Sequence, residues 1–130
     1  MEKYGLLGKK AVAVIDYKFD EKYLQTENQA YHNDRVMRKM ISLFERYFGK
    51  INYLNQYNRQ AFIISADNTE EKDIVNTIRT IYNIFIKENK HVHVRIGIGE
   101  IAQGLEGLKK SYDQSRIARK TINKSGVMFY

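Results

Sequence analysis

The sequence predicts an α/β (α+β) fold with a ferredoxin-like βαββαβ core and an added αβ unit, in which helices flank a mixed sheet. Two observations predict this architecture. Segments whose apolar residues alternate, as strands do, take turns with segments whose apolar residues recur every three or four residues, as helices do. Their order is strand, helix, strand, strand, helix, strand, then one more helix and strand, which extends the split βαβ order of ferredoxin-like sheets.

The chain is long enough for one domain with a core of its own. It has 130 residues, of which 43% are hydrophobic, and its ten Tyr and six Phe argue against disorder. Nothing along the sequence separates two units, since it has no repeat, no linker and no Pro. We therefore expect a lead-in over residues 1–10 and a single domain over residues 11–130.

Composition also excludes several kinds of site and location. The chain has no Cys, which rules out disulfides and thiolate metal sites. No apolar run approaches the roughly 20 residues that span a bilayer, and the first ten residues lack the apolar centre of a signal peptide. We expect a cytoplasmic protein without a membrane partner. The net charge of +7 is modest and typical of a solvated surface.

The first half of the domain alternates long elements with turns. Residues 11–17 are almost all apolar, which predicts a central strand covered on both faces, with Asp16 near its end. Residues 18–31 are polar and aperiodic, so we expect a loop. A helical pattern begins near Asn33 and stops at Gly49, the position of a C-terminal glycine.

A hairpin and a second helix follow. Residues 51–57 and 60–66 have strand patterns, and we place the turn at Asn58–Arg59 because Asn tolerates positive φ. Residues 67–69 offer N-cap side chains for a helix that continues to about Glu88. We expect the sheet to be antiparallel in the hairpin and parallel at its two crossovers.

The last third begins with the strand over residues 92–98, whose apolar residues lie on one side. Gly97 and Gly99 leave the other side nearly bare, so that a helix or a ligand can approach the backbone. Gly104 and Gly107 mark the joint to a helix over about 105–122. Its predicted inner stripe is Leu105, Leu108, Tyr112, Ser115, Arg119 and Ile122, and its outer face is basic. Residues 127–130 form a last short strand.

Candidate site residues are few. Asp16 lies at the carboxyl end of the central strand, where open α/β sheets bind ligands, but one carboxylate is a weak cation site. His91 and His93 share a face without a visible third ligand, so an exposed strand end is the favoured interpretation. Aromatic residues of the hairpin could stack on nucleic-acid bases, but cross-strand packing is favoured. We therefore predict no metal, no cofactor and no catalytic residue.

Three stretches resemble a known family: Asp16 at a strand end, Asn33–Asp34 at a helix start, and SYDQSRIARK over residues 111–120. Together with the order of elements, they resemble the GGDEF fold of diguanylate cyclases over residues 11–130. The resemblance implies a nucleotide-cyclase-like mixed sheet. It also implies that Asp16 matches the first aspartate of the Asp-x-Asp that holds the catalytic cation in that family.

The departures from that family imply a degenerate domain. Lys18 stands where the second aspartate would be, so Asp16 and Lys18 form a vestigial metal position open to another ligand. The hairpin motif Gly-Gly-Asp-Glu is replaced by Asn58, Arg59, Gln60 and Ala61, which cannot bind metal or support attack by a ribose hydroxyl. The expectation is a protein that is not an enzyme.

A closer resemblance covers the last third. Ile96-Gly97-Ile98-Gly99, Gly104-Leu105-Glu106-Gly107-Leu108 and Ser111-Tyr112 are similar to the GGDEF-like domain of bacterial transcription regulators of the sugar-diacid and purine-catabolism type. In such regulators these glycines and the Ser-Tyr pair are structural. The resemblance implies a sensor domain and a C-terminal helix-turn-helix as partners in the full-length protein. The helix-turn-helix is absent from residues 1–130.

The expected function is non-catalytic: signal relay, dimerisation or effector sensing in a bacterial transcription regulator. A homodimer and a small effector stay open as partners, and we expect no direct DNA binding by this fragment. Two alternatives also stay open. The first is an active nucleotide cyclase of the diguanylate type, and the second is a basic ferredoxin-like nucleic-acid-binding module.

Overall fold

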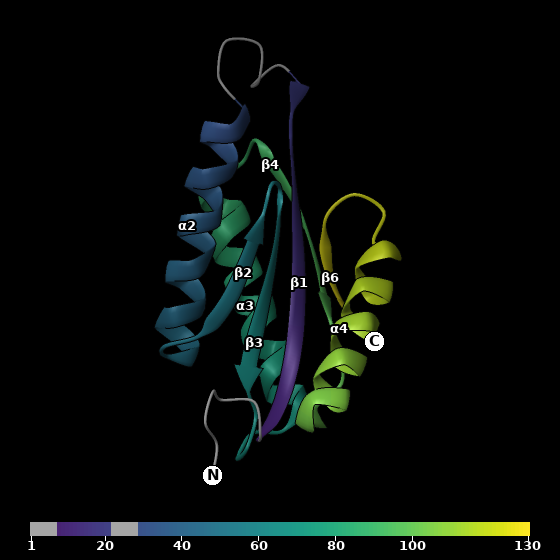
Figure 1. The fold of residues 1–130 in the computed structure, drawn as a ribbon. Coiled ribbons are helices and arrows are strands. Elements are labelled where there is room, and N and C mark those ends of the chain that lie inside the picture. Colours follow the sequence, from purple (N-terminus) through teal and green to yellow (C-terminus); the bar gives the residue numbers. More distant parts are fainter. Residues whose placement is uncertain (1–7, 22–28) are drawn as a thin grey trace.

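A computed structural model describes residues 8–21 and 29–130, and it confirms the predicted fold class. Helices flank a six-stranded mixed sheet (Figure 1). The elements in chain order are β1 (Lys9–Phe19), α2 (Gln29–Phe48), β2 (Asn52–Gln56), β3 (Arg59–Ser65), α3 (Glu71–Glu88), β4 (Val92–Ile98), β5 (Ala102–Gln103), α4 (Gly104–Lys120) and β6 (Gly126–Phe129). No described helix is long and apolar enough to cross a membrane.

The strand order is β2-β3-β1-β4-β6, and the two-residue β5 pairs with the start of β1. β1 is antiparallel to both of its neighbours, β3 and β4. As predicted, each crossover joins two strands that run parallel to each other, and an antiparallel strand lies between them. β3 separates β1 from β2, and β1 separates β3 from β4. The parallel pair of the described sheet is β4–β6.

The core lies between one face of the sheet and helices α2 and α3, whereas α4 covers the opposite face (Figure 1). Alternate residues of β1 from Ala11 to Phe19 point into this core. Phe44 of α2 stacks on Phe62 of β3 with ring centroids 4.1 Å apart. The other residues of β1, including Asp16, therefore belong to the face that α4 covers in part.

Several predicted boundaries were displaced. β1 extends to Phe19 because it pairs with β4 as far as Val92, so the predicted loop over 18–31 was wrong at its start. That loop also ends early, since α2 begins at Gln29, and residues 22–28 lie outside the described part. Of the predicted lead-in, Lys9 and Lys10 belong to β1, and residues 1–7 lie outside the described part.

Two predicted local features were also wrong. The hairpin turn is Tyr57–Asn58, with Tyr57 at φ 47°, and Arg59 already pairs with Gln56. The predicted cap of α3 is absent, since Glu70 is the N-cap and no side chain bonds there. The Asp67 carboxylate instead accepts a hydrogen bond from the Lys9 amide at 2.9 Å.

Helix α4 packs unusually close to the sheet. A Cβ on Gly97 would lie 2.0 Å from the Ser115 carbonyl oxygen, and one on Gly99 would lie 2.0 Å from that of Ser111. The Ser111 hydroxyl accepts the Val12 amide of β1 at 3.0 Å. At such distances only glycine fits on the strand, so both glycines are required by packing.

This close packing changes which face of α4 is buried. The predicted inner stripe was correct at Ser115, Arg119 and Ile122, which are all buried. It was wrong at Leu105 and Tyr112, which are 64% and 40% exposed. Small residues replace large apolar ones on a helix that touches bare backbone, so apolarity was a poor guide to its inner face.

We predict that Gly97→Val destabilises the fold by about 1–3 kcal/mol, because the new side chain overlaps the α4 backbone. Thermal and urea unfolding measure the change. Ser65→Val, at the exposed end of β3, is the control and should change stability little. An unchanged melting temperature for Gly97→Val would mean that this face of the sheet is open rather than packed.

Candidate functional site

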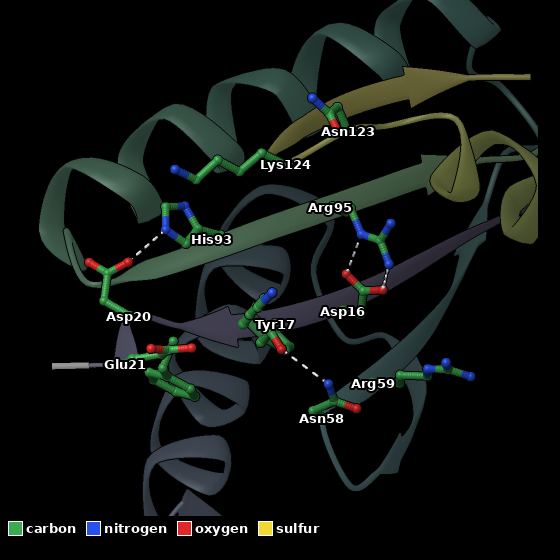
Figure 2. Close-up of a pocket in the computed structure, with 12 residues that line it drawn as sticks. Asp16, Tyr17, Asp20, Glu21, Asn58, Arg59, His93, Arg95, Asn123 and Lys124 are labelled. Carbon is green, nitrogen blue, oxygen red and sulfur yellow. Dashed lines mark hydrogen bonds and ion pairs between the residues drawn. The ribbon is translucent and has the colours of Figure 1, made fainter. Parts of the chain in front are cut away.

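An open groove of about 770 Å³ lies at the carboxyl end of β1 (Figure 2). Four segments distant in the sequence form it: the last residues of β1, the turn between β2 and β3, the first half of β4, and the loop between α4 and β6. Its polar lining residues include Asp16, Lys18, Asp20, Asn58, Arg59, His93, Arg95 and Lys124. Four of the sequence-predicted positions therefore line this groove: Asp16, Lys18, Asn58 and Arg59.

Asp16 is held by arginines. The register of the sheet sets it between Arg59 of β3 and Arg95 of β4. Arg95 binds both carboxylate oxygens, with Nε 3.0 Å from Oδ1 and Nη2 2.5 Å from Oδ2 (Figure 2). Arg119 approaches from α4, with Nη1 3.3 Å from Oδ2. Because the Asp16 residue is only 7% exposed, these contacts are shielded from water and are strong.

The arginine contacts have an electrostatic consequence. Hydrogen bonding to Asp16 raises the pKa of Arg95 above its ordinary value. The Arg95 guanidinium is further held by the Ile122 carbonyl, which accepts from Nη1 at 3.3 Å. Arg95 thus links β1, β4 and the segment that follows α4.

The residues at the groove do not fit the divalent cation that a GGDEF-type site would hold. Both oxygens of Asp16 already accept hydrogen bonds from Arg95, and a magnesium or calcium site needs further oxygen ligands. Lys18 is exposed and supplies an ammonium group instead of a carboxylate. Within residues 8–21 and 29–130, no group of three His, Asp or Glu side chains is placed to hold a metal.

The four hairpin residues that replace the cyclase motif have separate roles. The Asn58 side-chain amide donates to the main-chain carbonyl of Tyr17 at 3.1 Å (Figure 2). The main-chain carbonyl of Asn58 accepts a hydrogen bond from the Tyr17 amide. Gln60 is buried on the core face, where it donates to the Met37 carbonyl at 3.0 Å and accepts the Tyr17 hydroxyl. These two residues brace the hairpin.

The other two hairpin residues differ from that pair. Arg59 is exposed, and its side chain extends away from the turn (Figure 2). Ala61 is half-buried opposite Val14. Of the four substituted positions, Arg59 is therefore the one with a charged and exposed side chain.

The remaining predicted residues surround the start of α4. Gly104 has φ +77°, a left-handed conformation that glycine allows at the entry to the helix. A Cβ on Gly107 would lie 2.9 Å from the Cβ of Ala102. Tyr112 is exposed, and the Arg116 guanidinium lies 5.7 Å from its ring centroid. Gly104, Gly107, Ser111 and Tyr112 thus lie on α4, outside the groove.

Sequence reasoning missed one pair in the groove. The His93 Nε2 atom lies 2.7 Å from Oδ1 of Asp20, although the two residues are far apart in the chain (Figure 2). This hydrogen bond lowers the pKa of Asp20 below its ordinary value. Arg95 was also missed, although its place on the polar side of an alternating strand, two residues before Gly97, was a usable signal.

Comparisons with known proteins concern the family and the fold of the chain. A model of the GGDEF-like domain family matches residues 4–121 of the chain. The comparison with curated proteins gives no significant match.

Several solved structures share the fold. The chain is similar to the active GGEEF domain of a diguanylate cyclase from Vibrio cholerae, with a TM-score of 0.65 and 14% identity over 95% of this chain and 83% of that one. It is also similar to the adenylyl cyclase CyaB from P. aeruginosa, with a TM-score of 0.61 and 15% identity over 93% of this chain and 76% of that one. At these identities the likeness concerns the fold alone.

We predict that Arg95→Met costs about 2–3 kcal/mol of stability, because it leaves the buried Asp16 carboxylate without its main partner. Urea unfolding measures the loss. Arg59→Met is the matched control, since it removes the same charge on the other side of Asp16 and should cost much less. Asp16→Asn in the Arg95→Met background should recover part of the loss. Equal losses for the two arginine variants would show that the pair is not the stabilising contact.

Proposed function

We propose, since the chain belongs to the family of GGDEF-like domains, that it is a non-catalytic relay domain of a bacterial transcription regulator of the sugar-diacid or purine-catabolism type. In this role it passes a conformational or assembly signal to attached sensor and DNA-binding domains in the cytoplasm. It does so without making or breaking a covalent bond.

The observation that carries this proposal is the state of Asp16. Two-metal phosphoryl transfer needs carboxylates free to bind cations. Here Asp16 is the carboxylate at the matching position, and its oxygens are engaged by Arg95 and approached by Arg119. A cation at this point would have to displace a guanidinium from a buried ion pair, which is costly.

The hairpin supports the same proposal. In a cyclase of this family the turn brings backbone and carboxylates to the nucleotide. In this chain the corresponding Asn58 and Gln60 form structural hydrogen bonds with Tyr17, and Arg59 adds a positive charge. The turn therefore stabilises the fold instead of presenting acidic ligands.

The regulator assignment is supported by the last third of the sequence. Its paired glycines and Ser111 are the residues through which α4 docks on the sheet. The stretch that most resembles the regulators is thus the one that packs α4 against the sheet. A domain kept for its shape and contacts suits a relay role, in which dimerisation or an effector changes how neighbouring domains are held.

One alternative, an active nucleotide cyclase, is favoured by the fold, since the similar structures include a diguanylate cyclase and an adenylyl cyclase. Fold alone does not carry function, because catalytic residues are placed on folds independently. The other alternative is nucleic-acid binding through hairpin aromatics. It is weakened at Phe62, which is fully buried against Phe44 and cannot stack on a base, whereas Tyr53 and Tyr57 are exposed.

We predict no cyclase activity with GTP or ATP in the presence of Mg²⁺ or Mn²⁺, because the carboxylates that would hold the cations are missing. Product analysis by chromatography measures cyclic nucleotides, with an active diguanylate cyclase domain as positive control. The proposal fails if the chain turns over nucleotide and Asp16→Ala abolishes that turnover.

We also predict that these 130 residues bind DNA weakly and without sequence preference. The basic residues on the outer face of α4 can contact phosphates, but such contacts carry no sequence information and weaken steeply with salt. Titration against unrelated duplexes at low and physiological salt, with Lys109→Gln as a charge control, measures both properties. Sequence-selective binding that survives physiological salt would place the DNA-reading part inside this domain.

A further inference from the structure

A second cavity lies on the α4 side of the sheet, apart from the centre of the groove at the end of β1. It occupies about 130 Å³ between α4 and the exposed face of β2 and β3. This is more than the roughly 30 Å³ that one water molecule takes up in the liquid. The lining residues that matter here are Leu54, Gln56, Arg59, Tyr112, Arg116 and Arg119.

Arg119 is buried in the wall of this cavity without adequate partners. It is 2% exposed, and its Nε and Nη1 atoms have no hydrogen-bond acceptor in the described structure. Nη1 is 3.3 Å from Asp16, but outside hydrogen-bond geometry, because that carboxylate is aligned with Arg95. Buried donors in native proteins are almost always satisfied, so a ligand is a natural source of the missing acceptor.

The charge around the cavity is strongly positive. Arg59, Arg116 and Arg119 line it, and Asp16 is the acidic residue that contacts this cluster, through Arg119. No ion pair is recorded for Arg59 or Arg116 within residues 8–21 and 29–130. Burial lowers the pKa of Arg119; Asp16 opposes this, while Arg59, Arg95 and Arg116 add to the lowering. Like charges gathered around one cavity disfavour one another, so an anion bound there would be favoured.

We propose that this cavity is a metal-independent binding site for a small dianion, either a phosphate group or a dicarboxylate. Guanidinium groups match both oxyanions through paired hydrogen bonds, and Arg119 has two free donors to offer. Tyr112 and Leu54 give the cavity an apolar wall for the organic part of such a ligand. The site goes beyond the relay role, because it would be present in a relay domain and in a cyclase alike.

The position of the site gives it a means of signalling. It bridges the hairpin of β2 and β3 to α4, and Arg119 also contacts Asp16. A dianion that draws the three arginines together would tighten α4 against the open half of the sheet. Binding would therefore stabilise the folded domain in proportion to ligand concentration.

The experiment is a titration of the full chain with sodium phosphate and, separately, sodium succinate, at constant ionic strength held by sodium chloride. Melting temperature and the NMR signals of the arginine Nε–H groups are followed. We expect saturable binding of at least one anion, with shifts at Arg116 and Arg119. Tighter binding of phosphate would identify the ligand as one with a phosphate group, and tighter binding of succinate would identify it as a dicarboxylate.

Variants test the assignment of the site. Arg119 also packs against Gly97, so the variants are made at the other two arginines. Arg59→Gln and Arg116→Gln should each weaken binding about tenfold, as expected for the loss of a hydrogen bond between charged groups. Lys110→Gln removes the same charge from an exposed position on α4 that does not line the cavity, and it should leave affinity unchanged.

Three outcomes would overturn the proposal. The first is no saturable binding of either anion. The second is an equal loss for Lys110→Gln, which would mean diffuse attraction. The third is binding that is lost in Lys124→Gln but not in Arg116→Gln, which would move the anion to the groove. The cyclase assay is a separate readout, so failure here leaves the proposed function untouched, and the reverse also holds.

Discussion

The close approach of α4 to the sheet is the constraint on which the rest of this structure depends. Gly97 and Gly99 remove the side chains that would hold the helix away, and carbonyl groups of α4 occupy the space where Cβ atoms would be. The Ser111 hydroxyl then reaches the Val12 amide, and the next turns bring Arg119 over the central strand. Without this contact, Asp16 would face solvent and the arginine cluster would not form.

The same contact explains why arginines surround the Asp16 carboxylate. In a low-dielectric position a carboxylate needs a positive partner, and a metal ion or a guanidinium can fill that need. Here the sheet register sets Arg95 beside Asp16, and the helix adds Arg119. The groove at the end of β1 therefore has a carboxylate at its centre that guanidinium groups neutralise. The fold of this domain and the charges at its groove therefore have to be considered separately.

The groove and the arginine cavity share Arg59, which links the hairpin to both. The hairpin is braced by Asn58 and Gln60 through Tyr17, whose hydroxyl is buried deeply enough to raise its pKa well above the ordinary value. In the relay role that we propose, these contacts would let a change at Arg59 reach β1 through the paired strands.

Periodicity in the sequence was sufficient for the order of the major elements and the fold class, because alternation and helical spacing reflect burial on one face. It also indicated that Gly97 and Gly99 admit a close neighbour, which the packing of α4 confirms. That Asp16 lies where a ligand binds stays a prediction. The neighbours of Asp16 were decided by tertiary structure. Strand register set Arg95 against it, and helix docking buried Arg119 while exposing Tyr112. These contacts join residues distant in the chain, and local sequence patterns do not specify strand register or how closely a helix packs on the sheet.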